Sequence, residues 1–296
     1  NYFKKFIYGD HSYGNAVSGS KSSVEQLEVS DVKAFYAAHY VPNGAAIAIA
    51  GDFKAADMEK QLKSLFKDWK KGEVNAASLA SEETKPLQKS RILLVNKEDA
   101  TETTFLIGQK GISRNNPDYV SLQVINTILG GRFTSWLNDE LRVNSGLTYG
   151  AGSSFNAMKN SGTFTISTFT KNESTTDAID LALQVNKRLH DQGLDEETLT
   201  SAKNYINGQY PPRYETSGDL ADLMASMFLY NFDASFINNF QKSVDELTVE
   251  KSKELITKYF PKDNLQFVLV GKATEIREAV KKYGDITEKE ITAEGF

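Results

Sequence analysis

Two side chains that could bind a peptide carbonyl lie close together near the middle of the sequence, Arg142 and Tyr149. Arginine offers a fixed fork of N–H donors and tyrosine a single directional hydroxyl, so such a pair could stabilise a developing oxyanion. The sequence pattern predicts a short helix that ends near Arg142 and a strand that carries Tyr149, with Gly146 in the turn between them. A turn of this kind can aim both groups at one cavity.

A structural role for both residues is the alternative. Arg142 would then be a cation at a helix end, where it suits the helix dipole, and Tyr149 would be a packed strand residue. The spacing of seven residues, taken alone, favours this structural interpretation. The pair Gly130-Gly131 upstream is by itself weak support for any function.

The three histidines are spaced too far apart to form a metal-binding motif. No two of His11, His39 and His190 lie three or four residues apart, and the chain has no cysteine to serve as a ligand or nucleophile. His39 and His190 lie near the ends of amphipathic helical patterns, where we expect structural roles, and the loop-like setting of His11 predicts a turn. No Gly-x-Ser-x-Gly elbow or phosphate-binding loop is found. The sequence therefore predicts no metal ligands and no cofactor-binding residues.

The order of elements repeats along the chain at nearly constant spacing. Four landmarks of the first part have counterparts 219 to 222 residues further on. They are the pairs Tyr8 and Tyr230, Leu27 and Leu247, Pro42 and Pro261, and Gly51 and Gly271. In each copy an apolar helical stripe stops at a proline, and a short apolar strand and a glycine follow. The repeat predicts two copies of one α/β unit.

The spacing of the landmarks also sets the predicted domain boundaries. A unit of about 220 residues would place the start of the first copy upstream of the first residue. We therefore expect residues 1–75 to be the C-terminal part of a first domain, residues 76–89 a linker, and residues 90–296 a complete second domain. The first part should expose apolar helix faces and sheet edges unless another surface covers them. One such face is the stripe Val32, Phe35, Tyr36 and Tyr40.

Hydrophobic periodicity predicts an α+β fold. Strands are expected at 45–50, 91–98, 102–110, 147–158 and 161–170, the last two as an antiparallel hairpin. Helices are expected at 119–129, 134–143, 175–191, 220–230 and 234–244. Runs of strands followed by runs of helices are typical of an antiparallel-rich sheet with helices packed on one face. The short apolar strand at 45–50 should be buried in such a sheet.

Composition narrows the classes of partner. Hydrophobic residues make up 40% and charged residues 25%, as in an ordinary globular protein, and the net charge of −5 makes nucleic acid an unexpected partner. The longest apolar run, at 45–50, is too short to span a bilayer, and no signal peptide is recognised at the start. The absence of cysteine fits an exported or a cytosolic protein and does not choose between them, so the localisation is left open, with the periplasm or cell envelope favoured over the cytoplasm.

The segment around Arg142 resembles a hallmark of the pitrilysin/insulinase-type zinc metallopeptidases, including relatives of the mitochondrial processing peptidase. That hallmark is a glycine run, a serine, Leu-Arg and then Gly-Leu-x-Tyr, with seven positions from the arginine to the tyrosine. Here it reads Gly130-Gly131, Ser135, Leu141-Arg142 and Gly146-Leu147-Thr148-Tyr149. Residues 11–52 are similar to the end of the family's N-terminal domain, so the resemblance covers the whole chain. The chain looks like the C-terminal, inactive domain preceded by the end of the N-terminal one.

The resemblance implies a fold and a division of labour. Peptidases of this family are built from homologous α/β-sandwich domains of the LuxS/metallohydrolase-like type, and the N-terminal domain holds zinc through an inverted His-x-x-Glu-His helix and a distant Glu. Those ligands would lie upstream of residue 1. Arg142 and Tyr149 would contact the substrate carbonyl, and an extended peptide would bind as an added strand. Ser12 and Trp136 depart from the family's usual proline and arginine, which affects a turn and the local cleft surface.

Two hypotheses follow for the function. The first is that the chain is the C-terminal portion of a zinc metalloendopeptidase, which supplies the substrate-binding half of the cleft and is inactive alone. The alternative is a non-catalytic partner or scaffold subunit of the same family. Both imply extended peptides and a zinc-bearing domain or subunit as partners, and the exposed faces of residues 1–75 also suggest self-association.

Overall fold

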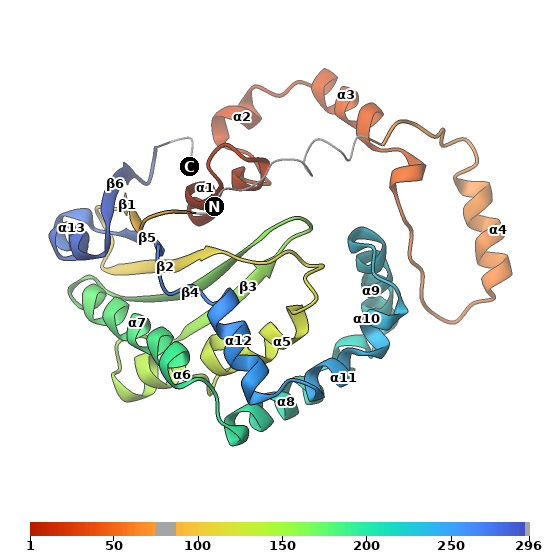
Figure 1. The fold of residues 1–296 in the computed structure, drawn as a ribbon. Coiled ribbons are helices and arrows are strands. Elements are labelled where there is room, and N and C mark those ends of the chain that lie inside the picture. Colours follow the sequence, from red (N-terminus) through yellow and green to blue (C-terminus); the bar gives the residue numbers. More distant parts are fainter. Residues whose placement is uncertain (75–86, 294–296) are drawn as a thin grey trace. The chain divides into compact units, whose positions relative to one another are not determined.

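The computed structural model describes residues 1–74 and 87–293, and its packing divides the chain into two compact units (Figure 1). The first unit combines Asn1–Val17, Thr84–Asn207 and Asn238–Phe296. The second combines Ser18–Glu83 and Gly208–Ile237. The first unit contains the β-sheet and therefore the core that positions the candidate site.

The sheet of the first unit has six strands in the order β3-β4-β2-β5-β1-β6. Their bounds are β1 Arg91–Asn96, β2 Glu102–Lys110, β3 Ala151–Ala157, β4 Gly162–Lys171, β5 Gln266–Gly271 and β6 Asp285–Glu290. The pairs β3–β4, β4–β2 and β2–β5 are antiparallel, and β1 runs parallel to both β5 and β6. The prediction of an α+β fold with an antiparallel-rich sheet is confirmed.

The helices of the first unit are α1 Tyr2–Tyr8, α5 Tyr119–Asn126, α6 Trp136–Asn138, α7 Thr175–Gln192, α8 Glu196–Gln209, α11 Phe240–Asp245, α12 Val249–Tyr259 and α13 Ala273–Val280. Two π-helical segments, Thr127–Gly131 and Asp139–Asn144, follow α5 and α6. The second unit carries α2 Lys21–Glu25, α3 Val29–His39, α4 Ala55–Leu65, α9 Ser217–Tyr230 and α10 Ala234–Asn238. None of the helices in the described ranges is long and apolar enough to cross a bilayer.

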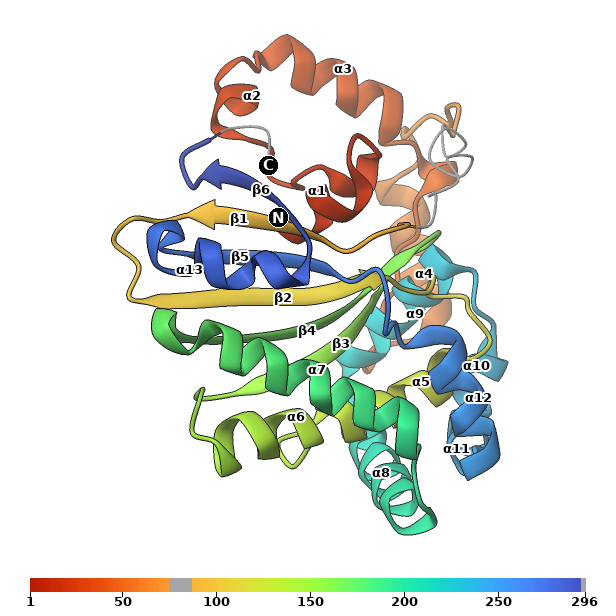
Figure 2. The ribbon, with the colours of Figure 1, turned by 60° about the vertical axis from the view of Figure 1, so that its left-hand side comes forward.

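Helices cover both faces of the sheet where β1 and β5 lie. Successive side chains of a strand point to opposite faces, so Leu93 and Val95 share one face, where they pack with the apolar side chains of α1. Ile92 and Leu94 point to the other face and are fully buried there, on the side of α7 and α13. Figure 2 shows α7 and α13 crossing the sheet on that side. The main helical layer therefore lies on one face, as expected, and α1 adds a small cover to the other.

Some helices of the two predicted copies recur at the predicted spacing. Helices α3 and α12 both have 11 residues, and their first residues, Val29 and Val249, are 220 positions apart. Helices α1 and α9 end at corresponding residues with positive φ, Gly9 at 58° and Asn231 at 56°. The two copies differ in burial. Leu255 of α12 is 1% exposed, whereas α3 has no buried residue at all.

The strand expected at 45–50 is not formed, and its residues are exposed or half-buried. Its counterpart at the repeat spacing is β5, which is hydrogen-bonded on one side to β1 and on the other to β2. A strand needs such neighbours to satisfy its N–H and C=O groups, and residues 45–50 have none in the described part of the chain. The prediction of a buried sheet strand at 45–50 is therefore wrong.

The predicted boundaries at residues 75 and 89 stay predictions. Most of the expected linker, residues 75–86, lies outside the described residues. Residues 1–17 pack with the sheet of the first unit.

Candidate functional site

The two predicted site residues, Arg142 and Tyr149, are brought together by the structure, and a third residue joins them. The guanidinium carbon of Arg142 lies 4.7 Å from the ring centroid of Tyr149 and 4.7 Å from that of Phe133. Cations at such distances over aromatic faces are attracted by the ring quadrupole. We call Phe133, Arg142 and Tyr149 the aromatic bracket.

The polar groups of the aromatic bracket have no partner in the described ranges. The Arg142 side chain makes no hydrogen bond or ion pair there, although the neighbouring Glu140 pairs with Arg188 at 3.6 Å and bonds Asn144 at 3.1 Å. The Tyr149 ring is 76% exposed, and its hydroxyl is likewise without a bond in that part of the chain. The guanidinium thus contacts two aromatic rings, while its N–H donors stay available to an acceptor from outside.

The π-helical segment Asp139–Asn144 places Arg142 at the surface. The five-residue hydrogen-bond spacing of a π-helix is seen at Ser145, whose N–H donates to the Glu140 carbonyl at 3.1 Å. The Ser145 hydroxyl also donates to the Leu141 carbonyl at 2.9 Å. Gly146 then turns the chain with φ at 66°, in the left-handed region that favours glycine. Short π-helical segments of this kind are frequent at functional sites.

Tyr149 lies in a loop and not in a strand, which corrects the prediction of a strand from Leu147. Strand β3 begins only at Ala151. A side-chain bond and not strand pairing fixes the loop: the Thr148 hydroxyl accepts a bond from the Gly150 N–H at 3.2 Å. The Leu147 N–H also bonds back to the Leu141 carbonyl at 2.9 Å. As a result the Tyr149 ring projects outward and is not packed in the sheet.

Asn138 ties the two arms of the aromatic bracket together. This residue is 4% exposed, and its side-chain amide donates to the Phe133 carbonyl at 2.6 Å. Its side-chain oxygen accepts a bond from the Ala151 N–H at 3.3 Å, at the end of the loop that carries Tyr149. One buried side chain therefore links the backbones on either side of Arg142.

The glycine pair ahead of Phe133 serves close packing. A Cβ at Gly130 would lie 2.2 Å from the Ser153 nitrogen, so any larger residue would push the helical segment away from β3. Asn126 directly precedes the π-helical segment Thr127–Gly131. Its side-chain amide donates to the Ser153 carbonyl at 2.9 Å, and its side-chain oxygen accepts from the Ser153 hydroxyl at 2.7 Å. These contacts fix the start of the segment against the sheet. Trp136, which departs from the family pattern, carries Arg188 over its ring at 4.2 Å.

The histidines occupy structural positions in the described chain. His11 caps a 3₁₀ turn by accepting a bond from the Tyr13 N–H at 3.0 Å, as predicted for a turn residue. His39 ends α3 with its ring 4.5 Å from that of Phe35. No group of three or more His, Asp or Glu residues suited to a metal ion is found among residues 1–74 and 87–293.

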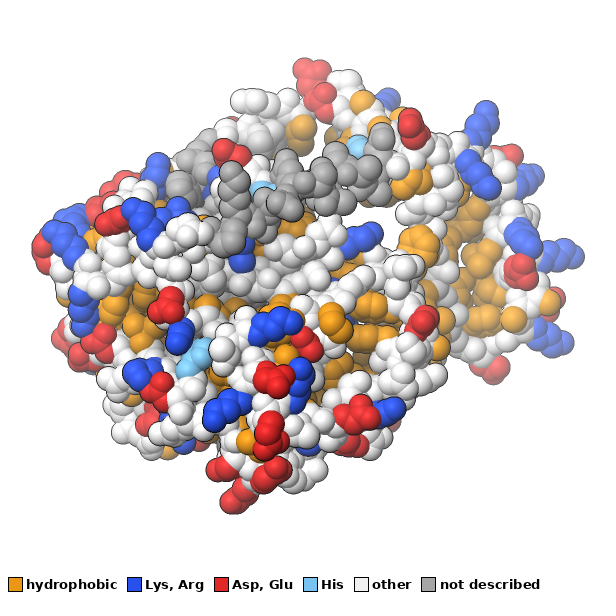
Figure 3. All heavy atoms as spheres, viewed as in Figure 1, with side chains coloured by type: hydrophobic (Ala, Val, Ile, Leu, Met, Phe, Trp, Pro, Cys, Tyr) orange, Lys and Arg blue, Asp and Glu red, His pale blue; other side chains and the backbone are white. Residues whose placement is uncertain are grey.

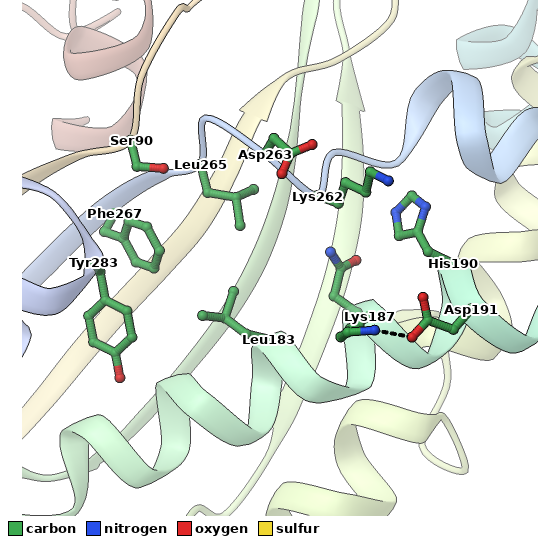
Figure 4. A pocket seen from close by; sticks show the side chains of 11 residues that line it. Ser90, Leu183, Lys187, His190, Asp191, Lys262, Asp263, Leu265, Phe267 and Tyr283 are labelled. Carbon is green, nitrogen blue, oxygen red and sulfur yellow. Dashed lines mark hydrogen bonds and ion pairs between the residues drawn. The ribbon is translucent and has the colours of Figure 1, made fainter.

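His190, near the end of α7, borders a cavity of about 490 Å³ in the first unit (Figure 4). Its floor is apolar and consists of Leu183, Leu265, Phe267 and Tyr283. On its rim Lys187 pairs with Asp191, and Figure 4 shows the His190 ring close to Lys262. Burial lowers the pKa of His190, and the charge of Lys262 acts in the same direction. The His190 Nε2 atom has no hydrogen-bond partner in the described chain and is shielded from solvent.

Acidic and basic side chains are mixed on the surface of the first unit. Figure 3 shows basic and acidic side chains interspersed over the face that carries α7, α12 and α13. Several are paired there, including Lys282 with Asp180 at 2.6 Å and Arg277 with Glu288 at 2.6 Å.

The fold and the glycine-Arg-Tyr segment define an α+β domain, and comparison with known proteins gives its family. The model of the peptidase M16 inactive domain family matches residues 26–206, and the chain belongs to that family. Pitrilysin and insulinase are peptidases of the same group, so the resemblance seen in the sequence is confirmed.

Known relatives agree with this assignment. The chain is 22% identical over 268 residues to the non-peptidase homolog YmxG of Helicobacter pylori, covering 90% of this chain and 61% of that protein. It is 24% identical over 260 residues to an uncharacterized zinc protease of Mycobacterium leprae, covering 86% of this chain and 57% of that protein. The chain therefore spans about three fifths of the length of these relatives.

A solved structure shows the same fold. The peptidase M16 inactive domain from Pseudomonas fluorescens superposes with a TM-score of 0.83 at 29% identity, covering 91% of this chain and 63% of that one. A protease from Helicobacter pylori gives a TM-score of 0.77 at 19% identity and supports the fold alone.

Proposed function

We propose that this chain supplies the substrate-carbonyl-binding half of an M16 peptidase cleft and hydrolyses no peptide alone. In this proposal Arg142 donates hydrogen bonds to a carbonyl of an extended peptide, and Tyr149 adds its hydroxyl. The observation that carries it is the pair of unpartnered polar groups in the aromatic bracket, since a guanidinium without an ion pair or hydrogen bond leaves all its donors for a ligand.

The zinc of the family does not fit this chain. The described residues contain no suitable group of ligands, the chain has no cysteine, and the histidines that cap a turn, end α3 and border the cavity are far apart in sequence. We therefore place the metal in a second, zinc-bearing domain or subunit. The relatives are longer than the part matched here, which leaves room in them for such a domain.

The exposed stripe of α3 fits a partner of that kind. Val32, Phe35, Tyr36 and Tyr40 are each between 57% and 60% exposed, although their counterparts in α12 lie in a core. Burying an apolar stripe of this size against another domain would be favourable. This supports docking to a further domain or subunit.

Two measurements test the proposal. Metal analysis of the isolated chain should find no stoichiometric zinc, and the chain should not cleave an unfolded peptide. Combined with the zinc-bearing region of its parent or partner, it should restore peptide hydrolysis. One tightly bound zinc per isolated chain would contradict the proposal, as would hydrolysis by the chain alone.

A second candidate function is that of a non-catalytic partner subunit. The similarity to a protein named a non-peptidase homolog favours it. In that case no zinc motif would be found in the parent gene or in a subunit that binds this chain. The chain would then bind peptides or assemble a complex without hydrolysis.

A further inference from the structure

We infer that Phe133 is a positioning and specificity residue of the carbonyl-binding site. Its ring restrains the guanidinium of Arg142 through a cation–π contact and offers its exposed surface to a large apolar side chain of the bound peptide, next to the carbonyl that Arg142 contacts. The inference rests on the proposed function of Arg142. It adds a residue that lies outside the glycine-Arg-Tyr pattern.

The first argument is geometric. Both rings stand 4.7 Å from the same guanidinium carbon, so the positions of Phe133 and Tyr149 together restrict how Arg142 can move. In the described ranges the Arg142 side chain makes no ion pair or hydrogen bond that would restrict its movement. An arginine side chain has many rotamers, and fixing it in advance reduces the entropy lost when a ligand binds.

The second argument concerns the attachment of Phe133. Its carbonyl is fixed by the 2.6 Å bond from the buried amide of Asn138. That same side chain accepts the bond from Ala151 near the Tyr149 loop, so the two rings are set relative to each other by the backbone. The Phe133 ring is therefore presented from a fixed position although it is 66% exposed.

The third argument gives the class of substrate. The exposed area of Phe133 is apolar, and the exposed ring of Tyr149 also lies 4.7 Å from the guanidinium carbon. A peptide that places a carbonyl on the guanidinium would bring a neighbouring side chain over one of these rings. A phenylalanine or leucine there would bury apolar area against Phe133, whereas alanine or an acidic residue would gain little.

The test uses the chain assembled with its zinc-bearing domain or subunit, the variants Phe133→Ala and Phe133→Tyr, and two peptides that differ only in phenylalanine or alanine beside the scissile bond. We expect Phe133→Ala to lower kcat/KM for the phenylalanine peptide about tenfold and for the alanine peptide much less. Phe133→Tyr should restore the preference. Phe169→Ala, at a partly exposed phenylalanine of β4, is the matched control and should behave as wild type.

The outcomes separate this inference from the proposed function. Equal losses for both peptides, or none for either, in a protein where Arg142→Ala still abolishes turnover would overturn the role of Phe133 alone. Unchanged turnover in Arg142→Ala would overturn the proposed function. Nuclear magnetic resonance of the isolated chain gives an independent readout, because the Arg142 Nε–H signal should lose its ring-current shift in Phe133→Ala, and an unmoved signal would contradict the positioning role.

Discussion

The carbonyl of Phe133 accepts a 2.6 Å hydrogen bond from the side chain of Asn138, five residues further along the chain. The same buried amide also accepts the Ala151 N–H, so one residue holds both arms around Arg142. Asn138 thus fixes the backbone on both sides of Arg142 from a buried position. This arrangement leads to a prediction about Asn138.

Replacing Asn138 with leucine should destabilise the first unit and weaken the site. The variant removes two part-buried hydrogen bonds, one of them to the Phe133 carbonyl, which together cost about 1–3 kcal/mol in the free energy of unfolding. Urea unfolding followed by circular dichroism measures this. Asn144→Leu is the matched control, since Asn144 is exposed and bonds only Glu140, and it should change stability by less than about 0.5 kcal/mol. Equal stability of both variants would contradict the assigned role.

Tyr8 should be a main contributor to the docking of α1 on the sheet. Its side chain is 7% exposed, and its hydroxyl lies 2.9 Å from the Ser161 hydroxyl and donates to the Gly162 carbonyl at 2.7 Å. Tyr8→Phe would remove both bonds, although the Gly162 carbonyl keeps its bond from the Gly111 N–H at 2.7 Å, and we expect a loss of about 0.5–1.5 kcal/mol in the free energy of unfolding. Tyr2→Phe, whose hydroxyl bonds the Ile291 carbonyl at an exposed position, serves as the control and should have a much smaller effect. The account of α1 fails if the two losses are equal.

His190 should make the stability of the first unit depend on pH. Burial, and secondarily Lys262, lowers its pKa in the folded chain, so the unfolded chain binds the proton at a higher pH than the folded chain does. The stability is therefore complete above the ordinary value of about 6.5 and is lost as the pH falls from there toward the folded pKa.

His190→Gln should reduce this loss. Urea midpoints at pH 7.5 and pH 5 measure it: the wild-type chain should lose more stability between the two than the variant. An equal loss in both proteins would contradict the assigned role of His190 in the acid response.

Much of the sheet could be predicted because its strands have a strong local pattern. Strand β2 runs from Glu102 to Lys110 as expected, and α7 differs from its predicted range by a single residue. The apolar run at 45–50 has an equally strong pattern but no neighbouring strand, so the prediction was wrong there. Periodicity reports which residues could be buried, whereas pairing depends on partners far away in the sequence.

The site was predicted only in part for a similar reason. The proximity of Arg142 and Tyr149 followed from the turn at Gly146, since that signal is local. The loop position of Tyr149, the π-helical segments and the link through Asn138 depend on contacts between segments, which spacing does not reveal. Phe133 was not singled out, although its place directly after the glycine run and before the arginine could have drawn attention to it.

The most direct test of the central claim is peptide hydrolysis by the chain assembled with its zinc-bearing domain or subunit, with and without the side chains of Arg142 and Tyr149. Arg142→Ala and Tyr149→Phe remove the donors proposed to meet the substrate carbonyl, so kcat should fall about a hundredfold for arginine and less for tyrosine. Zinc content, measured in the same samples, should stay unchanged. Full turnover in both variants, with zinc retained, would contradict the claim that this chain supplies the carbonyl-binding half of the cleft.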